Sequence, residues 1–149
     1  MDQPLTKWYC DVCRETIEDV KNGLVIWKTT NESKSHGFKI VHQGKCDQKD
    51  YFYSDHLENF LGDDGMGVLL STLSLGPIKN LLYKDVHCAA NDIDEFVDFM
   101  RRVQTPFYEE ARSHFKNQDL LEEYSDSNQV TPYQPEELEN IVEKYGADR

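Results

Sequence analysis

Four residues in the first third of the chain have the types and the spacing of metal ligands. Cys10 and Cys13 form a C-x2-C pair, and His42 and Cys46 form an H-x3-C pair. Two thiolates of a C-x2-C turn can converge on one ion, and three sulfurs with one imidazole are a donor set that zinc binds tetrahedrally. The spacing therefore predicts one zinc site made by Cys10, Cys13, His42 and Cys46.

Two other interpretations of these residues stay open at the level of the sequence. Cys10 and Cys13 could form a thioredoxin-like redox pair, but such a pair normally follows a strand of a βαβ unit, and only nine residues precede Cys10. Alternatively, His42 is an ordinary sheet residue and Cys46 is a buried thiol. The zinc interpretation is favoured because both pairs have ligand spacing.

The other histidines and the fourth cysteine are weaker candidates. His56 begins a helix that could approach the site, and it is a reserve ligand. We expect His36 in a hairpin loop at the far end from the ligands. His87 and Cys88 are adjacent, so their side chains would point apart on a strand, and Cys88 is predicted to be a small buried hydrophobe.

Four protein ligands would fill the tetrahedral shell of zinc. A catalytic zinc typically keeps an open position for water beside three protein ligands. We therefore expect a structural zinc and predict no catalytic residue. The sequence also contains no H-E-x-x-H, G-x-S-x-G, P-loop or G-x-G-x-x-G motif.

The segment 101–112, R-R-V-Q-T-P-F-Y-E-E-A-R, is a second concentration of charged and aromatic residues. Its charged residues are Arg101, Arg102, Glu109, Glu110 and Arg112. They could form a buried ion-pair network that holds two helices together across Pro106. The alternative is a small enzyme with a cleft formed by Arg102, Tyr108, Glu109 and His114. Spacing alone identifies no nucleophile or acid–base pair there, so the structural interpretation is favoured.

The elements that must position these residues change in character near residue 50. Before it, Leu24–Trp27 and Phe38–His42 are β-branched and aromatic runs, which predicts a hairpin that returns the chain to Cys10. After it, glycines, prolines and acidic caps predict five to six helices. We expect residues 1–50 to form a zinc-binding β module and residues 51–149 an acidic helical domain, packed together as one unit.

Three of the expected helices can be specified by residue. Ser54 should cap a short helix that Gly62 ends, and Pro135 should open the last helix of the chain. Asn91 or Asp92 should begin a longer helix. Its apolar stripe, at helical spacing, would consist of Ile93, Phe96, Val97, Met100 and Val103.

The excess of negative over positive charge lies in the second part of the chain. The net charge is −12, and residues 51–149 carry eight Lys/Arg against twenty Asp/Glu. An acidic surface repels phosphates, which argues against nucleic acid as the partner of this part. The neutral first part leaves a further hypothesis, a nucleic-acid-associated regulator acting through Lys28, Lys34 and Lys39.

The sequence also bears on the compartment. Its N-terminus lacks the apolar region of a signal peptide, and its longest apolar stretch, 67–76, is shorter than the roughly 20 residues that span a bilayer. We expect a cytoplasmic protein without a membrane partner. In a reducing compartment the cysteines should be thiolate ligands or buried thiols, not disulfides.

With C-x2-C, H-x3-C and the 101–112 segment taken together, the chain resembles a group of uncharacterised bacterial proteins, some from mobile-element or phage settings. These join a zinc-ribbon-like N-terminal module to a helical remainder. The resemblance implies the same four metal ligands and carries no activity. The order of the two ligand pairs around a hairpin is also similar to zinc ribbons and treble-clef fingers. We therefore predict an α+β, non-enzymatic, zinc-stabilised protein that interacts with another protein.

Overall fold

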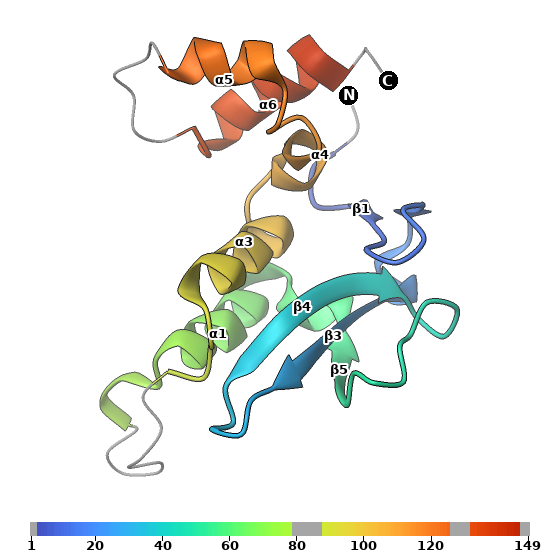
Figure 1. Cartoon of the computed structure of the whole chain (residues 1–149), viewed down its shortest axis with the longest axis vertical. Helices are drawn as coiled ribbons and strands as arrows, with labels where there is room; N and C mark the ends of the chain where they lie inside the picture. The colour runs from blue at the N-terminus through green and yellow to red at the C-terminus, as the bar shows by residue number, and fades with distance from the viewer. Residues whose placement is uncertain (1–2, 79–87, 126–131, 147–149) are drawn as a thin grey trace.

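The computed structural model describes residues 3–78, 88–125 and 132–146. Two small antiparallel sheets and five helices make up this part of the chain, so the predicted α+β class is confirmed (Figure 1). The strands are β1 (Trp8–Tyr9), β2 (Thr16–Ile17), β3 (Gly23–Thr29), β4 (Ser35–His42) and β5 (Tyr53–His56). The helices are α1 (Gly62–Leu73), α3 (Ile93–Gln104), α4 (Tyr108–Arg112), α5 (Gln118–Ser125) and α6 (Pro135–Tyr145). Short 3₁₀ helices cover Val20–Asn22, Leu57–Phe60 and Gly76–Ile78.

The predicted hairpin is confirmed as β3 and β4, which pair antiparallel with Gly23 opposite His42. This register brings His42 back to the start of β3. The strands extend further than predicted, and His36 lies in β4 opposite Lys28 instead of in the loop. Gly23 is required by a close approach, because a Cβ there would lie 2.5 Å from the Leu57 side chain.

The helix predicted from Ser54 is wrong in its first turn. Residues Tyr53–His56 form β5, which pairs with β3 and makes β3 the central strand of a three-stranded sheet. Only Leu57–Phe60 are helical before α1, as a 3₁₀ turn. The side chains of β5 are largely exposed, so the strand is held by backbone pairing with β3. For the same reason its sequence lacks the alternation of apolar and polar residues that predicts a half-buried strand.

Helix α3 packs against the three-stranded sheet through strand β4. Asp92 caps it by accepting hydrogen bonds from the N–H groups of Asp94 and Glu95, as predicted. Phe96, Phe99 and Val103 are buried, whereas Ile93 is 60% exposed. The apolar face is therefore rotated from the predicted stripe toward Phe99. The Phe99 ring stacks on Phe38 of β4, with 5.0 Å between the ring centroids.

The buried side chains form two clusters. The first joins the strands, the Leu57–Phe60 turn, α1 and α3, and so contains residues from both sides of position 50. The second lies among α4, α5 and α6 and consists of Tyr108, Ala111, Leu120, Leu138, Ile141 and Tyr145. Helix α6 starts at Pro135, as predicted. The chain thus crosses from one cluster to the other at the short link between α3 and α4.

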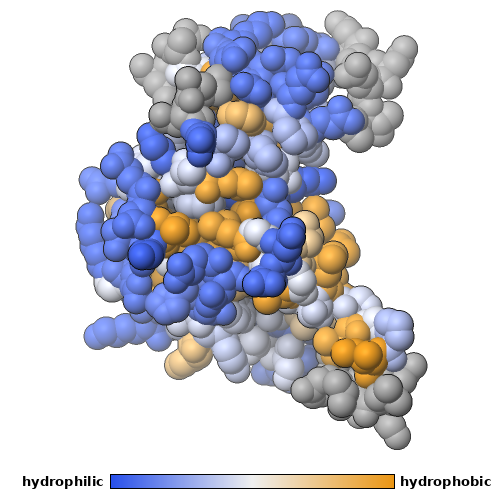
Figure 2. Space-filling view, turned by 180° about the vertical axis from the view of Figure 1, so that it is seen from behind, coloured by the Kyte–Doolittle hydropathy of each residue, from blue (hydrophilic) through white to orange (hydrophobic). Residues whose placement is uncertain are grey.

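The surface of the second cluster is polar. Viewed from behind, hydrophilic residues dominate the region of α5 and α6 (Figure 2). Within the described ranges, no helix combines the length and the apolar character needed to cross a bilayer.

Candidate metal centre

The four predicted ligands converge at the end of the hairpin where β4 terminates. One ligand atom from each of Cys10, Cys13, His42 and Cys46 can be chosen so that all four lie within 4.8 Å of one another. The His42 Nδ1 atom lies 3.3 Å from the Cys13 sulfur and 3.8 Å from the Cys46 sulfur. Ligands on a tetrahedral zinc are separated by about 3.5–3.8 Å. The spacing of the donor atoms therefore fits one tetrahedral metal ion.

The first two ligands lie on a tight turn between β1 and β2, which pair antiparallel. The Cys10 N–H donates to the Glu15 carbonyl at 2.9 Å, and the Arg14 N–H donates to the Cys10 carbonyl at 3.0 Å. Arg14 has a φ of 69°, in the left-handed region. This backbone reversal closes the segment Cys10–Arg14, the first ligand turn.

The other two ligands lie on a second ligand turn, His42–Cys46. Its ends are joined by the Cys46 N–H, which donates to the His42 carbonyl at 3.2 Å. Gly44 has a φ of 79°, which suits glycine and lets the chain turn back toward the hairpin. Asp11 connects the first ligand turn to β4: its N–H donates to the Ile40 carbonyl, and its carboxylate accepts from the Ile40 N–H, both at 2.8 Å.

The orientation of the His42 ring is fixed by its second nitrogen. His42 Nε2 lies 3.2 Å from the Thr16 carbonyl oxygen. A carbonyl only accepts hydrogen bonds, so Nε2 carries the proton, and in the neutral ring Nδ1 has a free lone pair. That lone pair is on the nitrogen nearest the sulfurs. A backbone carbonyl that holds the outer nitrogen of a histidine is the usual second-shell arrangement of a metal ligand.

The three thiols have unequal electrostatic environments. Burial raises the pKa of Cys10, but hydrogen bonds from the backbone of Cys13, Val12 and His42, together with the neighbouring His42 side chain, outweigh it and lower the pKa to about 6. Burial and the neighbouring sulfurs of Cys10 and Cys13 raise the pKa of Cys46 to about 11. A thiolate at Cys46 would be repelled by the neighbouring sulfurs of Cys10 and Cys13. A bound cation would offset that repulsion.

The weaker metal candidates lie outside the cluster. His56 is an exposed residue at the end of β5, and His36 lies near the loop end of the hairpin, away from His42. Cys88 is a free thiol whose sulfur is 3.6 Å from the Ala90 carbonyl, and His87 lies outside the described residues.

The first ligand turn does not have the frame of a redox pair. It joins two antiparallel strands of two residues each, whereas a thioredoxin-like C-x2-C opens a helix in a βαβ unit. All four cysteines are free. Three sulfurs and one imidazole would also close a tetrahedral shell, so the geometry favours a structural ion over a catalytic one.

The buried ion pair predicted for 101–112 is confirmed for Arg102 and Glu109, which are 3% and 2% exposed. The Arg102 guanidinium donates to both carboxylate oxygens of Glu109 at 2.7 Å. It also donates to Asp11 at 2.7 Å and to the Tyr9 carbonyl at 3.2 Å. Burial alone would lower the pKa of Arg102. The carboxylates of Glu109 and Asp11 outweigh burial and raise the pKa above its ordinary value, so the guanidinium stays charged.

This network extends beyond what the sequence predicted, because it includes the first ligand turn. Asp11 and Tyr9 flank Cys10, and the Tyr9 N–H donates to Glu109 at 3.2 Å. The Trp8 indole N–H donates to the Arg102 carbonyl at 2.9 Å. Spacing gave no signal for Asp11, since its partner is far away in the chain. Arg102 of α3 and Glu109 of α4 thus hold the segment around Cys10 through buried polar contacts.

Other polar and charged residues of 101–112 also have partners of their own. Tyr108 donates from its hydroxyl to Asp98, and Arg112 pairs with the same carboxylate at 3.3 Å. Arg101 lies over the Tyr133 ring, 4.3 Å from its centroid. Arg102 and Glu109 are held by each other, so neither is available as a free acid or base.

The lysines of the nucleic-acid hypothesis are partly neutralised. Lys28 pairs with Asp50 at 3.1 Å. Lys28 and Lys39 both lie over the Tyr51 ring, 4.7 and 5.3 Å from its centroid. Lys34 is in the turn of the hairpin, where its carbonyl accepts from the Thr30 N–H. Lys28 and Lys39 thus share one aromatic ring, and the Lys28 charge is also paired with an acid.

The site therefore consists of a cysteine- and histidine-rich cluster and a buried ion-pair network that share the segment Tyr9–Asp11. Comparisons with protein families, with curated proteins and with solved structures found no match for this chain.

Proposed function

We propose that this chain is a non-enzymatic protein whose N-terminal part is stabilised by one structural zinc ion bound to Cys10, Cys13, His42 and Cys46. The single observation that carries the proposal is the convergence of four donor atoms within 4.8 Å. The contact between His42 Nε2 and Thr16 supports it, because it directs the other nitrogen to the sulfurs. Zinc is the metal that this donor set favours.

A structural ion suits the local architecture. Strands β1 and β2 have two residues each, and such a short hairpin is unstable in water by itself. Structural zinc sites contribute about 10–16 kcal/mol of apparent binding free energy in small zinc modules. That amount is ample to hold the two ligand turns on β4.

We further propose that the protein works in the cytoplasm by binding another protein, as an interaction or regulatory module. The excess of acidic residues in 51–149 favours a partner with a basic surface. Apolar side chains that are open to solvent, Val68 and Leu70 on α1 and Phe52 before β5, offer additional contact area.

Metal analysis of the purified full-length protein, prepared without chelator, tests the zinc proposal. We expect about one zinc per chain and a Cys10→Ser variant that loses both metal and solubility. Cys88→Ser is the matched control and should keep the metal, because Cys88 lies outside the cluster. A metal-free wild-type protein, or equal zinc content in both variants, would contradict the proposal.

Cobalt substitution distinguishes the proposed ligands from adventitious binding. Tetrahedral Co²⁺ bound by thiolates has strong visible absorption and a thiolate-to-metal charge-transfer band. We expect both features in wild type and Cys88→Ser. His42→Ala should weaken them, and a spectrum without thiolate bands would refute the assignment.

A further inference from the structure

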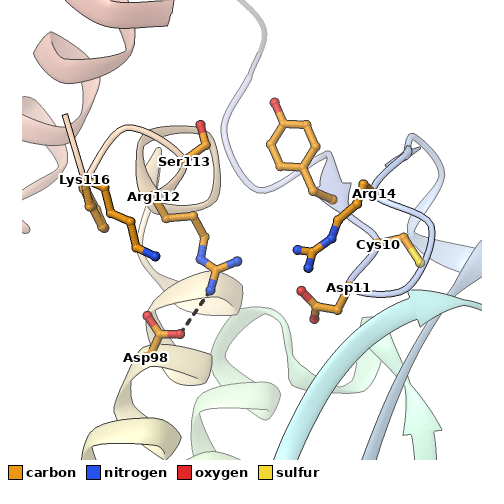
Figure 3. A pocket seen from close by; sticks show the side chains of 9 residues that line it. Cys10, Asp11, Arg14, Asp98, Arg112, Ser113 and Lys116 are labelled. Atoms are coloured by element: carbon orange, nitrogen blue, oxygen red, sulfur yellow. Dashed lines mark hydrogen bonds and ion pairs between the residues drawn. The ribbon is translucent and has the colours of Figure 1, made fainter.

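A hollow of about 640 Å³ lies between the first ligand turn and the segment from α4 to the start of α5. Its walls include the aromatic residues Tyr9 and Phe115 and the basic residues Arg14, Arg112 and Lys116. Figure 3 shows Arg14 and Lys116 reaching in from opposite sides, with Arg112 between them. Three cations in one hollow are unexpected in a chain with a net charge of −12.

The carboxylates of this hollow are already occupied by other donors. Asp11 accepts from Arg102 and from the Ile40 N–H. Asp98 accepts from the Tyr108 hydroxyl and from Arg112. Both acids keep their negative charge, so the lining carries two carboxylates against three cations.

Two of the three cations have no acidic partner. Within the described ranges, no ion pair joins Arg14 or Lys116 to a carboxylate. Arg112 has one partner, Asp98, at 3.3 Å, and a guanidinium has donors left after a single contact. Three cationic and two anionic side chains leave the lining of the hollow with an excess of one positive charge.

A smaller hollow of about 310 Å³ continues this one and shares Asp11, Arg14, Asp98 and Arg112 with it. It adds Lys39 and Glu95. Glu95 accepts hydrogen bonds from the backbone N–H groups of Gly37 and Phe38. Lys39 lies over the Tyr51 ring, so this smaller hollow adds one acid and one cation that both have contacts of their own.

We propose that the larger hollow binds the phosphate group of a small phosphorylated compound through Arg14, Arg112 and Lys116. Guanidinium groups match the oxygens of a phosphate, and a lysine adds a point charge. The volume suits a small molecule, and Tyr9 and Phe115 offer aromatic surface to a ring. The acidity of the whole chain opposes a long phosphate polymer. This proposal does not depend on which metal the cysteines bind.

Calorimetric titration of the full-length, metal-loaded protein at low salt tests the proposal, with AMP, adenosine, inorganic phosphate and a single-stranded oligonucleotide as probes. We expect AMP to bind and adenosine not to bind. Phosphate that binds as tightly as AMP would support the same site and identify free phosphate as the source. Adenosine binding like AMP, or an oligonucleotide binding more tightly than AMP, would overturn the proposal.

Single substitutions locate the binding. Arg14→Asn removes the charge with a residue that tolerates the left-handed backbone, and Lys116→Ala removes a charge remote from the metal ligands. Each should weaken AMP binding roughly tenfold, the loss of about one charge-assisted contact. The matched control, Lys49→Ala, removes an exposed lysine outside the hollow and should change nothing.

Zinc content, measured in parallel, separates this proposal from the preceding one. We expect all three variants to keep the metal. If Arg14→Asn lost it, Lys116→Ala would still decide the outcome. AMP binding that is unchanged in Lys116→Ala, or reduced as much in Lys49→Ala, would refute the phosphate site.

Discussion

Glu109→Leu should be the most damaging single substitution of a charged residue in this protein. It leaves the Arg102 guanidinium buried, with Asp11 and the Tyr9 carbonyl as its remaining partners. Two charge-assisted hydrogen bonds of 2.7 Å are lost at once. Breaking a buried ion pair from one side costs about 3–5 kcal/mol.

That cost is a large part of the total stability, since domains unfold with about 5–15 kcal/mol. For a chain of this size the midpoint of thermal unfolding should fall by about 10–15 °C. Glu15→Leu is a control, because Glu15 forms an exposed pair with Lys45 at 3.2 Å. Losing such a pair costs less than about 1 kcal/mol.

Urea unfolding of metal-saturated protein, followed by tryptophan fluorescence, measures the free energies. The indole of Trp8 is a suitable reporter because it is buried and bonded to the Arg102 carbonyl. The double variant Arg102→Met/Glu109→Leu removes both charges and should be more stable than the sum of the single losses predicts. Additive losses, or a cost below about 1 kcal/mol for Glu109→Leu, would refute this view of the network.

Two further perturbations probe the helices. Gly65→Ala should cost about 1–3 kcal/mol because a Cβ there would lie 2.1 Å from the backbone of Phe60. Gly67→Ala should instead stabilise α1 by about 0.5–1 kcal/mol, because no atom lies within 4 Å of its Cβ. Equal effects of the two substitutions on thermal unfolding would contradict this. Burial and the hydrogen bond to Glu137 raise the pKa of Tyr124 from 10.0 to about 12, so the unfolded chain releases this proton first, and the stabilisation present below pH 10 is lost between pH 10 and 12. Tyr124→Phe should flatten that loss in unfolding measured against pH, and an unchanged alkaline profile would count against the assignment.

The clustering of the four predicted ligand residues and the hairpin were predictable because both are encoded locally. A C-x2-C turn and an H-x3-C turn each constrain two ligands within a few residues. The β-branched runs between them predict a hairpin, and its register, with Gly23 opposite His42, brings the two pairs together. Strand β5 was not predictable, since its stability comes from pairing with β3 and not from its own exposed side chains.

The buried side of α3 shows why helical periodicity was not enough to predict which face is buried. Phe96, Phe99 and Val103 follow helical spacing, and Arg102 lies three residues after Phe99 on the same side. The predicted stripe through Ile93 satisfied the same period equally well. Periodicity alone cannot choose between two apolar faces of one helix, and the choice is made by aromatic packing on Phe38.

The first ligand turn brings the two proposals into one physical unit. Within five residues, Cys10 and Cys13 point to the metal cluster, Asp11 binds the buried Arg102, and Arg14 lines the basic hollow. A metal ion that fixes the two cysteines also limits where Arg14 can lie. Under both proposals, binding at the two sites is linked and the linkage is reciprocal. A ligand that favours the ordered turn raises the affinity for the metal by the same factor by which the metal raises the affinity for that ligand. Both proposed sites therefore include residues of the same element, the turn between β1 and β2.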